Sequence, residues 1–218
     1  MITVHAIVGS PFGRAAMIAA IEKQLDWRLA PVVPGQHREA AYLARQPFAR
    51  IPAIDHDGWG LYETQAILRY FDAIGRGPSL TPADPKAAAR MNQVMGIIDW
   101  YFFTQGSALT VLFNRVVAPR LGMPVNEAAI VEAMPKARHC IGVLAGFLEH
   151  SPWMAGDAFS LADIHAGAHM AFLAEAAPEG LDLIAGTPIP AWLARLDARP
   201  SFQRTTWNAV EAMAKEAA

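Results

Sequence analysis

The sequence has little cysteine and no excess of positive charge. Cys140 is the only cysteine in 218 residues, so no disulfide can form within the chain, and this usage fits a reducing compartment. Lysines and arginines number 18 and aspartates and glutamates 20, which gives a formal net charge of −2. A chain with this balance has no basic surface for a phosphate backbone, so we expect no nucleic-acid partner.

Long apolar runs are also absent. No uninterrupted apolar stretch in the sequence approaches the ~20 residues that a membrane-spanning helix needs. The opening residues, MITVHAIVGSPFGR, have no basic n-region, and their apolar run is short and broken, unlike that of a secretory signal. We therefore expect a cytoplasmic protein that does not enter a membrane.

What the chain does have is apolar residues, 53% of the total, enough at this length to bury a substantial core in one or two domains. Apolar patterning and turn residues in the first third predict alternating strands and helices. The predicted elements are a strand at 2–8, a helix at 14–24, a strand at 27–33, a short helix at 37–45, strands at 51–55 and 59–62, and a helix from Glu63-Thr64 onward. This order is typical of a mixed sheet with helices on both faces.

The pattern changes after a segment rich in glycine and proline at 75–82. No alternating strand pattern follows it, and the remainder is predicted to be helical. The predicted helices are at 84–115, 126–150, 160–176, 190–198 and 201–215. We therefore divide the chain into an α/β domain at 1–76, a linker at 77–83 and an all-helical domain at 84–218.

The most informative stretch is 47–73, PFARIPAIDHDGWGLYETQAILRYFDA. Asp57-Gly58 between two apolar runs predicts a hairpin, because both residues tolerate the positive φ of its turn. Pro52 lies inside the first predicted strand, where it removes a ladder donor, so that strand should be an edge or should bend. Glu63-Thr64 places a carboxylate, a hydroxyl and backbone N–H groups at a helix start. Such a pair of features suits a small zwitterionic peptide; an ordinary hairpin with a capped helix is the alternative.

The motifs of this stretch resemble the glutathione-binding half of the cytosolic glutathione S-transferases. The family pattern is roughly N-P-x-G-x-[IV]-P-x-L, then D-G, then L-x-E-[ST]-x-A-I-x-x-Y, and the chain departs from it at Gln46 and Ala49. A second run, GDAFSLADI at 156–164, resembles the family motif G-D-x-x-[ST]-[LIV]-A-D, which seats a core helix; Ser160 and Asp163 there form a capping-box signature. We therefore leave Asp163 out of the active site. The resemblance covers the whole chain, and its details are those of a bacterial, serine-type member with plant-like or theta-like features.

The resemblance implies a fold and an activity. The fold is α/β plus all-α, with a thioredoxin-like N-terminal domain, βαβαββα, followed by an all-helical domain. The activity is conjugation of the glutathione thiolate, which is the nucleophilic form of the thiol, to small hydrophobic electrophiles. Glutathione is then a co-substrate, no metal is implied, and the relatives are homodimers. Glutathione-dependent peroxide reduction, dehalogenation or isomerisation, or binding of glutathione or a hydrophobic ligand without turnover, are the alternatives on this scaffold.

Ser10 is the candidate catalytic residue. It follows the first predicted strand and begins the run 10–23, which aligns with the S-P-F-x-x-x-x-x-x-A-x-x-E-K pattern of serine- and cysteine-type transferases. The resemblance implies that its hydroxyl contacts the glutathione sulfur. A serine before proline also commonly caps a helix, and a backbone N–H of Phe12 or Gly13, or the Arg14 side chain, are other candidates for holding the thiolate.

The resemblance also implies which residues hold glutathione. The backbone of Ile51 would meet the cysteinyl unit, with Pro52 cis, and Glu63 and Thr64 would bind the γ-glutamyl amino and carboxylate groups. The G-x-H-[KR] run at 35–38 resembles that of plant-like transferases, where an imidazole and a cation bind the glycyl carboxylate. The full predicted set is Phe12, His37, Arg38, Arg50, Ile51, Pro52, Glu63 and Thr64.

An aromatic cluster within 99–105 predicts the electrophile pocket. Four consecutive aromatic residues point in different directions around a helix, so at least one should face a cleft, although a core cluster is the alternative. His165 and His169 lie four residues apart on a predicted helix, and we assign them to the core or a pocket because no third metal ligand is evident. The predicted pocket residues are Phe12, Trp100, Tyr101 and Gln105.

Overall fold

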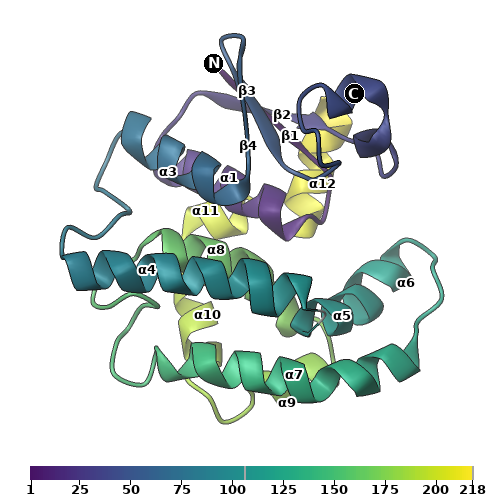
Figure 1. Cartoon of the computed structure of the whole chain (residues 1–218), viewed down its shortest axis with the longest axis vertical. Helices are drawn as coiled ribbons and strands as arrows, with labels where there is room; N and C mark the ends of the chain where they lie inside the picture. The colour runs from purple at the N-terminus through teal and green to yellow at the C-terminus, as the bar shows by residue number, and fades with distance from the viewer. Residues whose placement is uncertain (106, 218) are drawn as a thin grey trace. The chain divides into compact units, whose positions relative to one another are not determined.

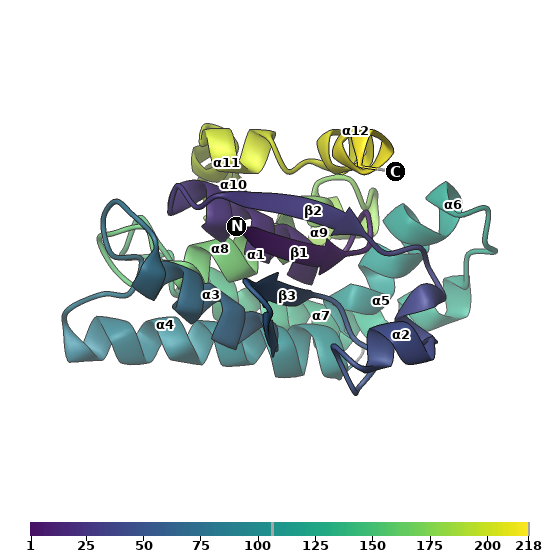
Figure 2. The ribbon, with the colours of Figure 1, turned by 90° about the horizontal axis from the view of Figure 1, so that it is seen from above.

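A four-stranded mixed sheet organises the first part of the chain in the computed structural model, which describes residues 1–105 and 107–217 (Figure 1). The strands are β1 (Ile2–Ala6), β2 (Trp27–Pro31), β3 (Ala53–His56) and β4 (Trp59–Tyr62). Their order in the sheet is β2-β1-β3-β4, and Figure 2 shows β1 between β2 and β3. β1 pairs in parallel with β2 and antiparallel with β3, and β3 pairs antiparallel with β4. The mixed sheet is therefore as the sequence predicts.

The helices between these strands complete the predicted βαβαββα order. They are α1 (Pro11–Glu22), the 3₁₀ turn η1 (Gln36–Arg38), α2 (Ala40–Leu43) and α3 (Thr64–Ile74). α1 packs against α3, and Ile18, Ile67 and Phe71 on these two helices are fully buried. The fold of this part is thioredoxin-like.

The predicted hairpin is confirmed. Asp57 has φ +52° and Gly58 has φ +86°, so both turn residues lie in the left-handed region that the Asp-Gly pair allows. The Asp55 carboxylate accepts the N–H of Gly58 at 3.1 Å. One expectation is wrong: Pro52 lies one residue before β3, not inside it, and β3 is paired on both sides rather than at an edge. Because the strand begins only at Ala53, the proline removes no ladder bond.

Several predicted boundaries also differ. β1 and β2 each end two residues early, and α1 begins at Pro11 because Ser10 caps it. The helix predicted at 37–45 is instead two short pieces, since Glu39 between them has extended φ and ψ of −81° and 151°. An extended residue cannot continue a helical hydrogen-bond ladder.

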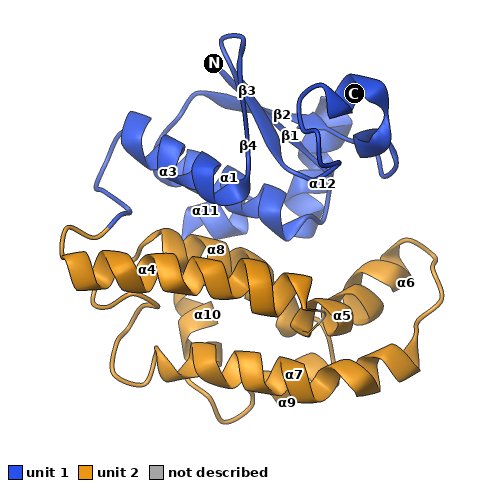
Figure 3. Cartoon of the chain, in the orientation of Figure 1, with its two compact units in different colours: residues 1–81, 197–218 blue, residues 82–196 orange. Residues whose placement is uncertain are grey.

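The described residues divide into two compact units, 1–81 with 197–218, and 82–196 (Figure 3). This division differs from the one drawn from the sequence, which gives 197–218 to the helical domain. The reason is local packing: α11 (Pro200–Gln203) contacts α1, and α12 (Trp207–Glu216) contacts β2. No described helix has the length and apolar character that crossing a bilayer requires.

The second unit is helical, as predicted. Its first long helix is not continuous, however, since two segments take the wider π-helical winding and thereby shift the faces that their side chains present. The elements are α4 (Pro85–Ile97), π-helical η2 (Ile98–Thr104), α5 (Ala108–Leu112), π-helical η3 (Phe113–Val117), α6 (Ala118–Arg120), α7 (Glu127–Gly146), α8 (Leu161–Met170), η4 (Ala171–Leu173), α9 (Glu179–Ile184) and α10 (Ile189–Asp197).

A buried carboxylate seats α8. Asp163 is fully buried and accepts the N–H groups of Met154 at 2.9 Å and Ser160 at 3.0 Å, the Ser160 hydroxyl at 3.1 Å and the Trp192 indole N–H at 2.9 Å. The predicted capping box is present. Asp163 therefore joins the start of α8 to the preceding loop and to α10, in the structural role that the sequence assigns to it.

Candidate functional site

The loop between β1 and α1 holds Ser10 at the N-terminus of a twelve-residue helix. Gly9 has φ +83°, and a Cβ at this position would lie 2.1 Å from the ring of Trp207, so only glycine fits. The Ser10 hydroxyl accepts the N–H of Gly13 at 3.2 Å. A serine hydroxyl has two acceptor lone pairs and one hydrogen. Ser10 can therefore cap the helix and still donate its hydrogen to a ligand.

Two alternatives to Ser10 are weakened by the contacts around it. The Gly13 N–H is used by the Ser10 hydroxyl. Arg14 is buried, and its guanidinium donates to the Phe202 carbonyl at 3.3 Å and the Thr205 hydroxyl at 3.4 Å and lies over the Phe202 ring. Arg14 thus fastens α1 to α11.

The loop before β3 carries the Ile51 backbone. The Ile51-Pro52 peptide bond is cis, as the resemblance implies. Within residues 1–105 and 107–217, neither the N–H nor the C=O of Ile51 has a hydrogen-bond partner. Both groups are available to pair with an extended peptide. The side chain of the neighbouring Arg50 is exposed.

Gln46 shapes this loop, a role that the sequence analysis missed. It is buried, and its side-chain oxygen accepts the N–H groups of Phe48 at 2.8 Å and Arg50 at 3.0 Å. Ala49, where the family pattern has glycine, has φ +53°, so the pattern's glycine answers a left-handed backbone. The signal was in the sequence: both departures from the pattern fall where the loop needs special conformation.

The start of α3 places Glu63 and Thr64 side by side. Glu63 has φ +72°, is exposed, and its carboxylate makes no capping bond to α3, contrary to the expectation that it complements the helix N–H groups. A non-glycine residue at positive φ costs of order 1 kcal/mol and such residues are concentrated at functional sites. Thr64 is buried as the first helical residue. The carboxylate is therefore free to meet a cationic group beside an open helix N-terminus.

The turn before α2 holds His37 and Arg38. Gly35 has φ +105°, and its N–H donates to Nδ1 of His37 at 3.3 Å. In the neutral imidazole this bond leaves the proton on Nε2, which can donate to a carboxylate. The Arg38 side chain is exposed.

The strand register brings these segments to one end of the sheet. Ala6, where β1 ends, pairs with Pro31, where β2 ends. One residue back, His5 pairs with Ala53, and Ala53 pairs with Tyr62 at the end of β4. The residues beyond these positions are those of the predicted glutathione site, and all leave the sheet at the same end: Ser10, Phe12, His37, Arg38, Arg50, Ile51, Pro52, Glu63 and Thr64.

The predicted electrophile residues are only partly brought together. Trp100 and Tyr101 on η2 are each 54% exposed, whereas Phe102 is buried. Tyr101 and Gln105 line a cavity in the second unit, but Trp100 is not among its lining residues. Phe12 belongs to the other unit. The cavity also takes Lys136, His139 and Cys140 from α7, which the sequence analysis did not single out; their i, i+3, i+4 spacing was the available signal.

The two helical histidines are core residues. His165 Nε2 lies 2.6 Å from the Asp99 carboxylate, and His169 Nδ1 lies 2.8 Å from the His165 carbonyl. Both side chains are fully buried. Burial, followed by the charge of His165, lowers the pKa of His169 to about 3. The described residues contain no group of three metal-ligating side chains.

Comparison with known proteins gives consistent matches along the chain. Two family models match: glutathione S-transferase, N-terminal domain, over residues 4–79, and glutathione S-transferase, C-terminal domain, over residues 91–200. A glutathione S-transferase of Hyoscyamus muticus is 30% identical, covering 92% of this chain and 95% of its own length. Glutathione S-transferase 3 of Zea mays is 31% identical, covering 84% and 83%. The apo structure of a glutathione S-transferase III has a TM-score of 0.81 at 28% identity, covering 97% of this chain and 96% of that one.

Proposed function

Because the chain belongs to the glutathione S-transferase family, we propose that it conjugates the glutathione thiolate to small hydrophobic electrophiles. The observation that carries this proposal is the shared end of the sheet, where the Ser10 loop, the cis Ile51-Pro52 bond and the start of α3 all lie. The serine-type and bacterial assignments remain predictions.

The reaction needs a thiolate at neutral pH. The thiol of bound glutathione gives its proton to solvent, and the Ser10 hydroxyl donates a hydrogen bond to the sulfur. The bond from the Gly13 N–H orients this hydroxyl, and the N-terminal end of α1 adds a positive potential. The sulfur lone pair then forms a bond to the electrophilic carbon. In a substitution the leaving group departs with its electron pair; in an addition a proton from water completes the product.

The remaining residues hold the peptide. The Ile51 backbone pairs with the cysteinyl unit, with Pro52 fixing the direction of the chain and Phe12 and Arg50 flanking it. Glu63 and the N-terminus of α3, with Thr64, take the γ-glutamyl amino and carboxylate groups. His37 and Arg38 take the glycyl carboxylate. The side chains of Trp100, Tyr101 and Gln105, with Phe12, contact the electrophile.

Glu63→Ala and Thr64→Ala test the glutathione cradle. Each is expected to weaken glutathione binding by about 1–3 kcal/mol, or roughly 5- to 150-fold, because a charge-assisted contact is lost. The measurement is calorimetric titration with glutathione, together with the KM for glutathione in conjugation of chlorodinitrobenzene. Glu149→Ala, which removes an exposed carboxylate in the second unit, is the control.

Unchanged affinity in both cradle variants would contradict the assigned cradle. The wild-type protein should also conjugate chlorodinitrobenzene faster than it reduces cumene hydroperoxide; the reverse order would favour a peroxidase and reject the proposed reaction.

The proposal includes a homodimer in the cytoplasm. Its support is the large apolar fraction of the chain and exposed apolar side chains such as Phe48 and Trp59, whose removal from water would favour association.

A further inference from the structure

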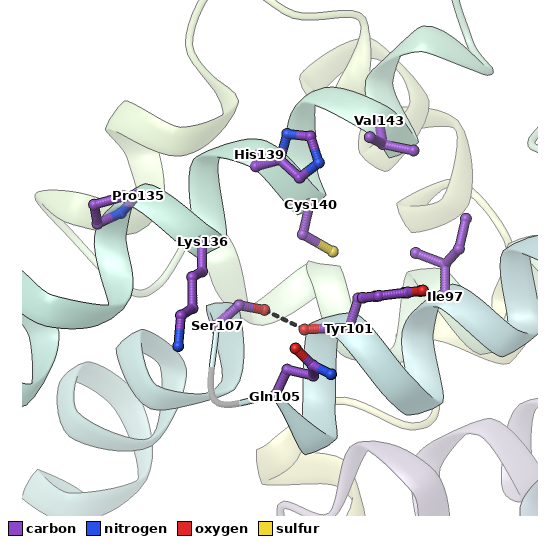
Figure 4. Close-up of a pocket in the computed structure, with 9 residues that line it drawn as sticks. All are labelled: Ile97, Tyr101, Gln105, Ser107, Pro135, Lys136, His139, Cys140 and Val143. Carbon is purple, nitrogen blue, oxygen red and sulfur yellow. Dashed lines mark hydrogen bonds between the residues drawn. The ribbon is translucent and has the colours of Figure 1, made fainter.

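A cavity of about 470 Å³ lies within the second unit, between η2 and α7 (Figure 4). Its volume falls within the range of roughly 300–1,000 Å³ that is usual for small-molecule sites. None of its lining residues belongs to the glutathione cradle. The lining residues are Ile97, Tyr101, Gln105, Ser107, Pro135, Lys136, His139, Cys140 and Val143.

The α7 side of the cavity is one helix face. Lys136, His139, Cys140 and Val143 follow one another at i, i+3, i+4 and i+7, a spacing that aligns side chains along a helix. Figure 4 shows these side chains on one side of the space, with Tyr101 and Gln105 facing them from the η2 side. The cavity is therefore a built space between two helical elements.

The lining divides into an apolar part and a polar part. Ile97, Pro135 and Val143 supply apolar surface. The polar ends of Tyr101, Gln105, Lys136 and His139 have no hydrogen-bond or ion-pair partner among residues 1–105 and 107–217. Several unpaired polar groups beside apolar walls are the arrangement that orients an amphipathic ligand.

The charge of the lining is positive. Lys136 is its only lysine or arginine, and none of the lining residues is an aspartate or glutamate. Arg138, two residues away, is paired with Asp182, so Lys136 differs from its neighbour in lacking a described carboxylate. An ammonium beside apolar surface attracts an anionic group and disfavours a cation.

We propose that this cavity binds amphipathic anions, with an aromatic or aliphatic body against Ile97, Pro135 and Val143 and a sulfonate or carboxylate at Lys136 and His139. The inference goes beyond the proposed function, since the binding requires neither glutathione nor turnover. An occupant would touch Tyr101 and Gln105, which we assign to the electrophile, but no residue that we assign to glutathione.

Cys140 provides a reporter for occupancy. It is the only cysteine in the chain and its side chain lines the cavity. Burial raises the pKa of the Cys140 thiol to about 11, so little thiolate is present near neutral pH and alkylation is slow. A ligand in the cavity covers this thiol and slows alkylation further.

The test is fluorescence titration with anilinonaphthalene sulfonate, compared with the neutral phenylnaphthylamine that lacks the sulfonate. Wild type is expected to prefer the sulfonate. Lys136→Met keeps the apolar stem and removes the charge, and should weaken sulfonate binding about tenfold, a loss of ~1.4 kcal/mol, while leaving the neutral probe unchanged. Lys136→Arg should retain the preference. Lys86→Met, on the exposed start of α4, is the matched control.

The second readout is the rate at which N-ethylmaleimide modifies Cys140. The sulfonate should slow this rate in wild type but not in Lys136→Met, and saturating glutathione should not displace the probe. Three results would each overturn the proposal: equal sulfonate affinity in wild type and Lys136→Met, a maleimide rate that the sulfonate does not change, or displacement by glutathione. The last would place the probe in the glutathione cradle.

Discussion

Replacement of Ser10 by alanine is expected to lower the rate of conjugation near pH 6.5 by about 10- to 100-fold, because a hydrogen bond to a charged group contributes ~1.5–3 kcal/mol. The bond exists only when the sulfur is ionised, so its loss raises the pKa of the bound thiol toward the free value. The pH at which the rate is half-maximal should therefore move upward, with each pKa unit worth about 1.4 kcal/mol. Glutathione affinity should change much less, since the cradle residues remain.

The helix cap must be separated from this effect. Ser10 also accepts the Gly13 N–H, and loss of such a cap costs about 0.5–2 kcal/mol of stability. Ser10→Thr keeps both the cap and the hydroxyl and should retain most of the rate. Thermal unfolding of each variant measures the cap, while the pH–rate profile measures the thiolate. An alanine variant with wild-type rate and profile would show that another group holds the sulfur.

Asp163→Ala is expected to unfold most of the protein. Four donors converge on this buried carboxylate, and each donor left buried without an acceptor costs ~1–3 kcal/mol. The sum is comparable with the ~5–15 kcal/mol that stabilises a typical domain. We expect a fall of more than about 10 °C in Tm, or no soluble protein. Calorimetry or circular dichroism makes the measurement.

Two variants make this prediction specific. Asp163→Asn keeps an acceptor oxygen and should lose less stability than the alanine variant. Asp157→Ala removes an exposed carboxylate six residues away and should behave as wild type. If Asp163→Ala retained the wild-type Tm and altered only turnover, Asp163 would belong to the active site and our structural assignment would be wrong.

The elements set by local chemistry were predictable from the sequence. Asp57-Gly58 fixes a hairpin through residues that tolerate positive φ, and Ser160 with Asp163 marks a helix start through a capping box. The site segments follow from these elements, because strand register alone carries the Ser10, Ile51 and Glu63 positions to one end of the sheet.

What depends on partners distant in sequence was not predictable. Arg14 looked available from its position in the chain, but its partners Phe202 and Thr205 lie 188 and 191 residues away. The packing of α11 and α12 on the first unit has the same origin. The π-helical winding of η2 is also invisible to an apolar period of 3.6 residues, so the exposed positions of Trp100 and Tyr101 could be expected but not their separate surroundings.

The central claim is that the Ser10 loop and the cradle together hold glutathione as a thiolate. The most direct test is a titration of the purified protein with reduced glutathione, following heat and thiolate absorbance together from about pH 5 to about pH 9, on either side of physiological pH. The account predicts saturable binding with a bound-thiol pKa well below that of free glutathione. Binding with an unshifted thiol pKa, or no binding, would contradict it.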